Sequence, residues 1–298
     1  MRLAAIDIGS NAARLLITDV IAGPLGSTEF IKTVLVRVPL RLGFDVFDKG
    51  EISPGKVEKI IKTIKSYRLL LDVYEVKHVK ACATSAMRDA LNAPEILKKV
   101  KEETGLVIDV ISGEQEASLI YENHIAENMT GEESYLYIDV GGGSTELTFF
   151  SDGKLVFKKS FNIGTIRLLK NQVTEAGWDE LKEFIRSKTK GYHHVTAIGT
   201  GGNINKVFSL SKRKDGKPLS LDLLRDYYKE FSNLSLSQRI SLHKLREDRA
   251  DVIVPALLIY INIMRWADAE EIFVPKIGLA DGLIHILHEE IRLRELEV

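Results

Sequence analysis

The sequence predicts an α/β protein built from two similar domains. A strand ending in aspartate, then a glycine-containing turn and a second apolar strand, occurs twice, at residues 3–20 and 135–150. The equivalent aspartates are Asp7 and Asp139. After each hairpin, strand-like apolar runs alternate with helical stretches, which is the pattern of an α/β fold. A length of 298 residues also agrees with two domains.

The first half of the chain contains further expected helices and strands. Ser53 followed by Pro54 predicts the start of a helix that continues to about Leu71, with serine as the N-cap and proline in the first turn. Strands are expected at 79–83 and 106–111. Helices are expected at 93–103 and from Glu114 into Ala126.

The second half continues the same alternation. We expect a strand at 195–198, a helix at 202–210, three helical stretches between 219 and 266, a strand at 271–275 and an amphipathic last helix at 280–297. The polar segment 128–133 is the expected boundary, giving domains 1–127 and 128–298. In an alternative division, the final helix, 280–298, completes the first domain.

Composition excludes several classes of protein. Basic and acidic residues nearly cancel, at 41 against 42, so no basic excess indicates a nucleic-acid partner. The single cysteine, Cys82, cannot form an intrachain disulfide, which favours a reducing compartment. Asp7 interrupts the apolar amino terminus, and the longest apolar stretch, 252–264, is too short to span a bilayer. We therefore expect a cytoplasmic protein without membrane association.

Three glycine-rich turns follow predicted strands, at 9–11, 141–145 and 199–203. Glycine lets a ligand approach the backbone, and successive N–H groups in such turns suit phosphate oxygens. Asp139 and Glu146 flank the second turn and could hold a divalent cation, since magnesium binds through one or two carboxylates plus phosphate oxygens. A plain hairpin, or close helix–strand packing, is the alternative for any one turn. Three turns together favour phosphate binding.

The segments 7–11 and 138–146 resemble the phosphate motifs of the exopolyphosphatase/guanosine pentaphosphate phosphatase family. The segments 83–88, 111–117, 199–203 and 249–256 are also similar to that family, in the same order along nearly the whole chain. The resemblance implies two actin-like ATPase (ribonuclease H-like) domains with an interdomain cleft. It also implies a homodimer.

The resemblance further implies roles for individual residues. Glu116 matches the general base that activates water, although a glutamate at a helix start is also favoured by the helix dipole. Asp139 and Glu146 match the metal-associated acids, and Asp7 could assist them or simply hold the first turn. Arg88 matches a phosphate-binding arginine, with a surface charge as the alternative. Together with the turns, this gives the expected phosphate-binding set: Ser10, Asn11, Arg88, Gly141, Gly142, Gly143, Ser144, Thr145, Gly201 and Gly202.

Together with these residues, the resemblance implies a metal-dependent phosphohydrolase. It would release terminal orthophosphate from inorganic polyphosphate, guanosine pentaphosphate or both, with Mg²⁺ or another divalent cation such as Mn²⁺ as cofactor. One alternative is a non-catalytic module that binds polyphosphate or an alarmone. Another is a different nucleotide phosphatase or ATPase on the same superfold.

Overall fold

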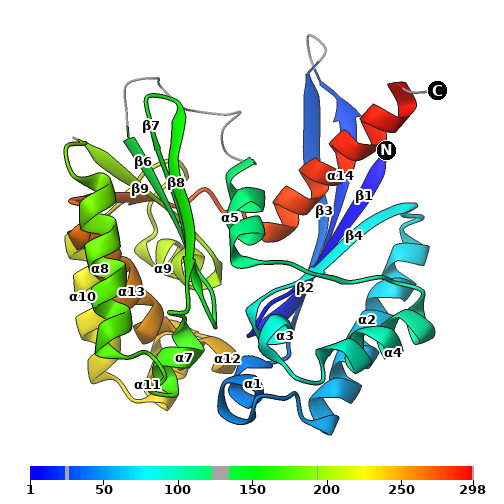
Figure 1. Ribbon diagram of the computed structural model, residues 1–298, viewed down its shortest axis with the longest axis horizontal. Coiled ribbons are helices and arrows are strands. Elements are labelled where there is room, and N and C mark those ends of the chain that lie inside the picture. The colour runs from blue at the N-terminus through cyan, green and yellow to red at the C-terminus, as the bar shows by residue number, and fades with distance from the viewer. Residues whose placement is uncertain (24–26, 123–133, 193, 297–298) are drawn as a thin grey trace. The chain divides into compact units, whose positions relative to one another are not determined.

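The computed structural model describes residues 1–23, 27–122, 134–192 and 194–296 (Figure 1). The chain forms two compact units: unit 1 comprises Met1–Ser112 and Leu279–Val298, and unit 2 comprises Gly113–Gly278. The boundary expected at 127/128 lies outside the described residues.

Unit 1 is built on a five-stranded mixed sheet. Its strands are β1 (Arg2–Ile8), β2 (Ala12–Ala22), β3 (Thr28–Pro39), β4 (His78–Ala83) and β5 (Asp109–Val110), in the order β3-β2-β1-β4-β5. The hairpin β1–β2 is closed by the Gly9 N–H, which donates to the Ala12 carbonyl at 3.0 Å. β3 extends it antiparallel, whereas β4 and β5 add on parallel.

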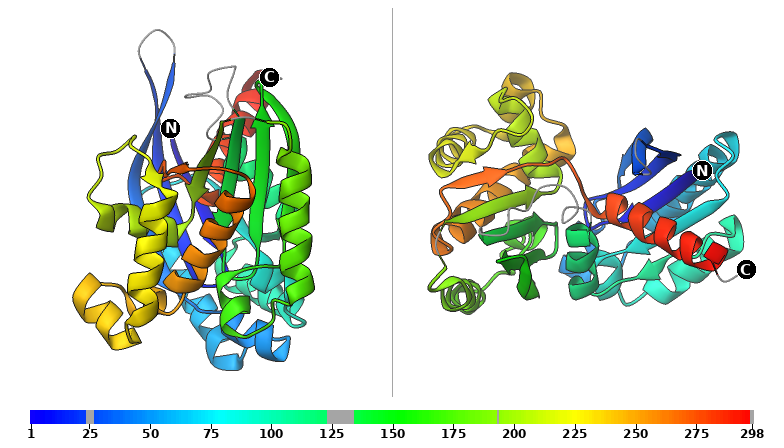
Figure 2. Two further views of the ribbon diagram at one scale, coloured as in Figure 1. Left: turned by 90° about the vertical axis from the view of Figure 1, so that its left-hand side faces the viewer. Right: turned by 90° about the horizontal axis from the view of Figure 1, so that it is seen from above.

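The helices of unit 1 are α1 (Gly43–Lys49), α2 (Pro54–Val73), α3 (Ser85–Asp89), α4 (Ala93–Thr104) and α14 (Leu279–Leu296). α2 begins at Pro54, as predicted, but the Ser53 side chain makes no capping hydrogen bond. α2 packs against α4, and α14 lies against β1, β2 and β4 (Figure 2). The last helix of the chain therefore packs on the first strand.

Unit 2 repeats the pattern with a six-stranded mixed sheet. Its strands are β6 (Ser134–Val140), β7 (Thr145–Ser151), β8 (Lys154–Phe161), β9 (Val195–Thr200), β10 (Leu219–Ser220) and β11 (Glu271–Phe273), in the order β10-β11-β9-β6-β7-β8. The second predicted hairpin, β6–β7, is extended antiparallel by β8, and β9 joins β6 parallel. The order β8-β7-β6-β9 corresponds to β3-β2-β1-β4 in unit 1, which supports the predicted internal repeat.

The helices of unit 2 are α5 (Gly113–Glu122), α7 (Thr165–Leu169), α8 (Glu175–Thr189), α9 (Gly202–Ser211), α10 (Leu221–Asn233), α11 (Leu236–His243), α12 (Glu247–Ala250) and α13 (Ile253–Trp266). α13 is buried along most of its length and packs against α10, as both views show (Figures 1 and 2). Residues 113–122, assigned to the first domain from sequence, group with unit 2 because α5 packs against β7 and β8.

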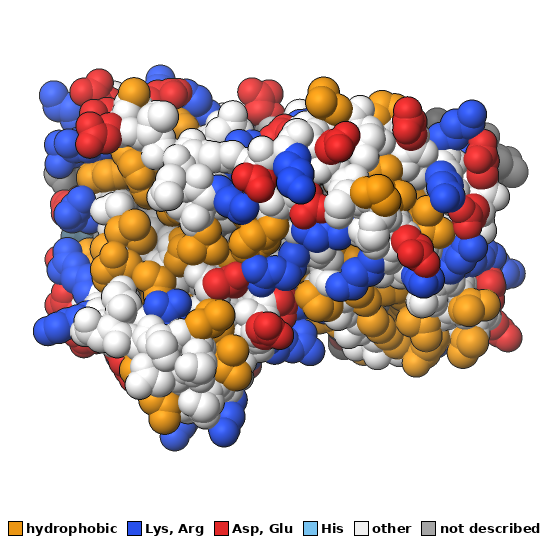
Figure 3. All heavy atoms as spheres, turned by 90° about the horizontal axis from the view of Figure 1, so that it is seen from below, with side chains coloured by type: hydrophobic (Ala, Val, Ile, Leu, Met, Phe, Trp, Pro, Cys, Tyr) orange, Lys and Arg blue, Asp and Glu red, His pale blue; other side chains and the backbone are white. Residues whose placement is uncertain are grey.

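Several expected elements differ from the structure. The strand expected at 106–111 is reduced to Asp109–Val110, and the region from 219 to 266 holds four helices instead of three because of the short α12. The continuation of α5 towards Ala126 lies outside the described residues. In the described part of the chain, no helix has the length and hydropathy needed to cross a membrane. On the face drawn in Figure 3, basic and acidic side chains are interspersed.

Candidate active site

Four polar residues form a single row across the sheet of unit 2. Ser160 of β8 pairs with Glu146 of β7, Glu146 pairs with Asp139 of β6, and Asp139 pairs with Thr200 of β9. Directly paired residues on neighbouring strands project to the same face of a sheet. The row therefore places two carboxylates next to each other, with a hydroxyl residue on each side.

The hydroxyl residues hydrogen-bond to the carboxylates. Ser160 Oγ donates to Glu146 Oε1 at 2.8 Å, and Thr200 Oγ1 donates to Asp139 Oδ1 at 2.9 Å. Glu146 and Thr200 are buried, and Asp139 is half-buried. Each carboxylate is thus held by a neighbour on its outer side.

A third carboxylate joins this pair from α5. Glu116 lies in the first turn of that helix and is buried, and one oxygen each of Glu116, Asp139 and Glu146 lie within 4.8 Å of one another. α5 can approach because Gly113 has no side chain: a Cβ there would lie 2.4 Å from Ser160 Oγ. The structure therefore brings together the expected base and two of the three expected metal ligands.

The donor set fits a hard divalent cation. Oxygen-only ligands suit Mg²⁺, Mn²⁺ and Ca²⁺, whereas zinc sites usually include nitrogen or sulfur ligands. Three carboxylates gathered in a largely buried place also repel one another unless a cation compensates their charge. We name Glu116, Asp139 and Glu146 the acidic cluster; its composition matches Mg²⁺ or Mn²⁺.

The glycine turn between β6 and β7 is held from one side by the start of α7. The carbonyls of Gly141 and Gly142 accept the N–H groups of Thr165 and Ile166 at 3.0 and 2.8 Å. The carbonyl of Gly143 accepts Arg167 Nε at 2.7 Å. In a trans peptide the N–H points opposite to the C=O, and no described peptide bond is cis. The N–H groups that follow these carbonyls therefore point away from α7, in the manner of an anion-binding nest.

Gly164 makes this arrangement possible. A Cβ at that position would lie 2.5 Å from both the Gly142 carbonyl oxygen and the Gly143 carbonyl carbon. Such a contact with backbone atoms cannot be relieved by rotating a side chain. The close packing of the turn on residue 164 therefore requires glycine.

The two hydroxyl residues that follow the glycines differ in their surroundings. Thr145 is fully buried and its Oγ1 donates to the Ile163 carbonyl at 2.5 Å, so the hydroxyl links the start of β7 to the segment between β8 and α7. Ser144 is buried, and its carbonyl accepts the Gly141 N–H at 2.9 Å. The phosphate-binding role expected for both hydroxyls stays a prediction, and Thr145 has an internal acceptor.

The third glycine segment follows β9 and approaches the acidic cluster closely. Gly201 has φ +104°, and a Cβ there would lie 2.9 Å from Asp139 Oδ1. Gly202 begins α9, whose amino terminus is suited to an anion. Tyr260 of α13 is buried, and its hydroxyl donates to the Thr200 carbonyl just before the turn. Burial, together with the charge of Asp139, raises the pKa of Tyr260, which keeps the hydroxyl protonated as a donor.

The remaining predicted phosphate-binding residues belong to unit 1. Ser10 is buried and its hydroxyl lies 2.7 Å from that of Ser85 at the start of α3. The Asn11 carbonyl accepts the N–H groups of Leu40 and Arg41. Arg88 is half-buried and donates to the Ile111 carbonyl at 2.7 Å. These contacts order the first turn and α3, and the binding role of the three side chains stays a prediction.

Asp7, the third expected metal ligand, is also in unit 1. It is buried, and Arg14 Nη1 donates to Asp7 Oδ1 at 3.1 Å across the β1–β2 pair. Burial raises the pKa of Asp7, and the Arg14 guanidinium partly offsets that effect. The structure thus gives Asp7 a basic partner, which supports the alternative that it holds the first turn; its metal role stays a prediction.

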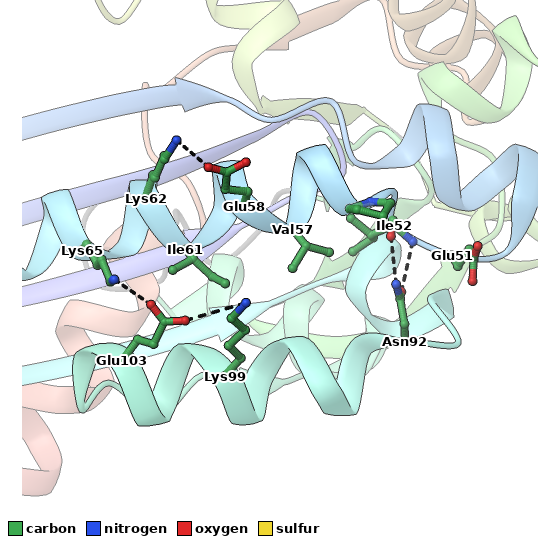
Figure 4. A pocket seen from close by; sticks show the side chains of 11 residues that line it. Glu51, Ile52, Val57, Glu58, Ile61, Lys62, Lys65, Asn92, Lys99 and Glu103 are labelled. Carbon is green, nitrogen blue, oxygen red and sulfur yellow. Dashed lines mark hydrogen bonds and ion pairs between the residues drawn. The ribbon is translucent and has the colours of Figure 1, made fainter.

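Unit 1 also carries a groove of about 550 Å³ between α2 and α4 (Figure 4). Ile52, Val57 and Ile61 supply apolar lining. Several of its charged residues form ion pairs. Lys65 lies 2.6 Å from Glu103, and Lys62 lies 2.6 Å from Glu58. The lining contains three acidic and three basic residues. With balanced charges, the lining favours neither an anionic nor a cationic ligand, so the acidic cluster is the stronger candidate site.

Comparison with known proteins identifies the family of this chain. Residues 31–290 match the sequence model of the Ppx/GppA phosphatase family. The chain belongs to this family. A member of the family from Aquifex aeolicus has a similar structure, with a TM-score of 0.75, 27% sequence identity and 98% of each chain covered. The fold, two mixed sheets with helices, is the actin-like ATPase fold, as predicted.

Curated relatives are longer than this chain. A bifunctional 3-dehydroquinate synthase/phosphatase of Fusobacterium nucleatum is 29% identical, covering 91% of this chain and 44% of that protein. A guanosine-5'-triphosphate,3'-diphosphate pyrophosphatase of Photobacterium profundum is 25% identical, covering 98% of this chain and 61% of that protein. The chain thus spans about half the length of these relatives. An exopolyphosphatase from Cytophaga hutchinsonii shares the fold, with a TM-score of 0.83 at 24% identity and coverage of 97% and 98%.

Sequence reasoning missed several residues that build the site. Ser160, Gly164 and Tyr260 were not among the candidates, and Thr200 was known only as part of a glycine-rich segment. Gly164 carried no clear signal, because the helix that follows it, α7, has only five residues. Ser160 and Tyr260 carried none, since their roles depend on strand register and on a distant helix.

Proposed function

We propose that the chain is a metal-dependent phosphohydrolase that releases terminal orthophosphate from inorganic polyphosphate, guanosine pentaphosphate or both. The observation that supports this most directly is the acidic cluster, in which three carboxylates from α5, β6 and β7 offer oxygens within 4.8 Å of one another. Asp139 and Glu146 flank the glycine turn whose N–H groups point away from α7. A cation site beside an anion-binding turn suits a phosphoanhydride substrate.

In this proposal the three carboxylates of the acidic cluster have two different roles. Asp139 and Glu146 hold Mg²⁺ or Mn²⁺, which when bound screens phosphate charge and stabilises the transferring group. Glu116 accepts a proton from the attacking water as general base. Glu116 lies in the first turn of α5, where the helix dipole favours a negative charge.

The glycine turn and α9 bind phosphate oxygens in the same proposal. The N–H groups of Gly142, Gly143 and Ser144 and the amino terminus of α9 at Gly202 supply donors without a fixed positive charge. Ser10, Asn11 and Arg88 of unit 1 also bind phosphate groups, with the Arg88 guanidinium suited to two oxygens at once. Homodimerisation stays a prediction from family resemblance.

The test is a phosphate-release assay on polyphosphate of several lengths and on guanosine pentaphosphate, with Mg²⁺ or with EDTA. The variant Glu116→Gln removes the base, and Glu114→Gln, at an exposed position on the same helix, is the matched control. Loss of the general base should lower the turnover rate by about 100-fold or more, while the control should retain wild-type activity. The ranking of substrates would identify the natural one.

Three outcomes would contradict the proposal. Phosphate release that persists in EDTA would show that the reaction needs no metal. A fully active Glu116→Gln would show that Glu116 is not the general base. Tight substrate binding without any turnover would favour the non-catalytic module.

A further inference from the structure

Two hydroxyl residues lie at the ends of the polar row across the unit 2 sheet, and neither belongs to the acidic cluster. Ser160 and Thr200 occupy the positions on either side of the acid pair, one on β8 and one on β9. Both are short hydroxyl side chains, and both donate to the neighbouring carboxylate. We propose that Ser160 and Thr200 are positioning residues, which fix Glu146 and Asp139 in the orientation that binds a divalent cation.

The internal repeat provides a comparison within the same chain. The corresponding row in unit 1 contains Arg37, Arg14, Asp7 and Cys82 on β3, β2, β1 and β4. There a single carboxylate pairs with an arginine, and neither flanking residue is a hydroxyl. The hydroxyl residues therefore accompany the acid pair and are not required by the fold of the repeat.

The Thr200 hydroxyl is held by its surroundings. Thr200 is buried, and its branched side chain has few χ1 rotamers. The Tyr260 hydroxyl donates to the Thr200 carbonyl, and the next residue, Gly201, has a positive φ and lies close to Asp139. In this place the Thr200 hydroxyl donates to one of the two oxygens of Asp139.

At the other end of the row, Ser160 is half-buried and lies against the start of α5. The Ser160 side chain fits against Gly113 only because residue 113 has no side chain. A Cβ there would lie 2.4 Å from Ser160 Cβ. The Ser160 hydroxyl donates to Oε1 of Glu146. Residues that orient metal ligands by hydrogen bonds commonly change metal affinity by about 10- to 100-fold when they are replaced.

This inference rests on the proposed metal role of the acidic cluster, and its test does not depend on turnover. Mn²⁺ binding to the metal-free protein is measured from the electron paramagnetic resonance signal of the free ion. Thr200→Val keeps the shape of the side chain and removes the hydroxyl, whereas Thr200→Ser keeps the hydroxyl. We expect Thr200→Val to weaken Mn²⁺ binding by about tenfold or more, and Thr200→Ser to bind within about twofold of wild type.

Ser160→Ala is the second variant and is expected to weaken Mn²⁺ binding by a similar factor. If Thr200→Val does not fold, as judged by circular dichroism, Ser160→Ala alone tests the positioning role. Wild-type affinity in the folded hydroxyl-free variants would overturn the positioning role and leave the metal centre intact. A wild-type protein that binds no Mn²⁺ would overturn the metal centre, and the positioning role with it.

Discussion

Glu146 lies directly opposite Asp139 across the β6–β7 pair, at the position where Arg14 lies opposite Asp7 in the β1–β2 pair. In unit 1 the acid is neutralised by its cross-strand partner, with Arg14 Nη1 3.1 Å from Asp7 Oδ1. In unit 2 two acids are opposed, and like charges in this position destabilise a sheet. The two hairpins share their pairing register and differ in charge, so only the second one sets two carboxylates opposite each other.

Replacing one acid of the pair should separate stability from metal binding. Glu146→Gln removes a negative charge from the acidic cluster and can still accept the Ser160 hydroxyl, so the metal-free variant should unfold at a Tm equal to or above that of wild type. The rise in Tm that Mn²⁺ produces in wild type should be lost, because a ligand stabilises a protein only by binding its folded state. Calorimetry with and without Mn²⁺ measures both effects. A variant that is less stable without metal and still responds to Mn²⁺ would argue against the acid pair as a cation site.

The turn after β9 should tolerate only glycine at residue 201. Gly201→Ala combines a positive φ with a Cβ 2.9 Å from Asp139 Oδ1, so we expect a loss of about 2 kcal/mol or more in the free energy of unfolding. Gly216→Ala is the control, since Gly216 also has a positive φ but has no atom within 4 Å of the added Cβ; its cost should be about 1 kcal/mol. Urea denaturation measures both variants. Equal costs would show that the approach to Asp139 imposes no constraint.

A pH-dependent contribution to stability is expected from Asp45 in α1. Burial alone would raise its pKa, but hydrogen bonds from Lys56 Nζ at 2.5 Å and the Ser53 N–H at 3.1 Å outweigh burial and lower the pKa below 3.8. An acid with a lowered pKa in the folded state stabilises the protein above its unfolded pKa and loses this contribution as pH falls through the folded value. Asp45→Asn should therefore cost about 1 kcal/mol at neutral pH.

The difference between wild type and Asp45→Asn should shrink as the pH falls below about 4. Urea denaturation at pH 7 and at pH 3 measures it. A difference that is the same at both pH values would contradict an ionised Asp45 as the source of the effect.

The sequence was sufficient for the parts of the fold that have local signals. Both hairpins have an aspartate, glycines and apolar strands in fixed order, and the α2 start has Pro54. β3 and β8 were not predicted, because both are edge strands whose residues are largely exposed and show little apolar alternation. The short α12 was missed because four residues are too few to establish a helical period.

The candidate site was predictable only in part. Asp139 and Glu146 could be proposed from the glycine turn, whereas Glu116 was chosen through family resemblance, because a glutamate early in a helix has no specific signal. Ser160 and Thr200 could not be assigned beforehand. Their contacts depend on the register of four strands, which no short segment encodes.

The most direct measurement of the central claim is anomalous diffraction at the manganese edge from crystals grown with MnCl₂. We predict an anomalous peak at the acidic cluster, with carboxylate oxygens of Asp139 and Glu146 at roughly 2.0–2.3 Å from it and Glu116 beside it. A manganese peak elsewhere on the protein, with the cluster empty, would contradict the assignment of these carboxylates as the metal centre.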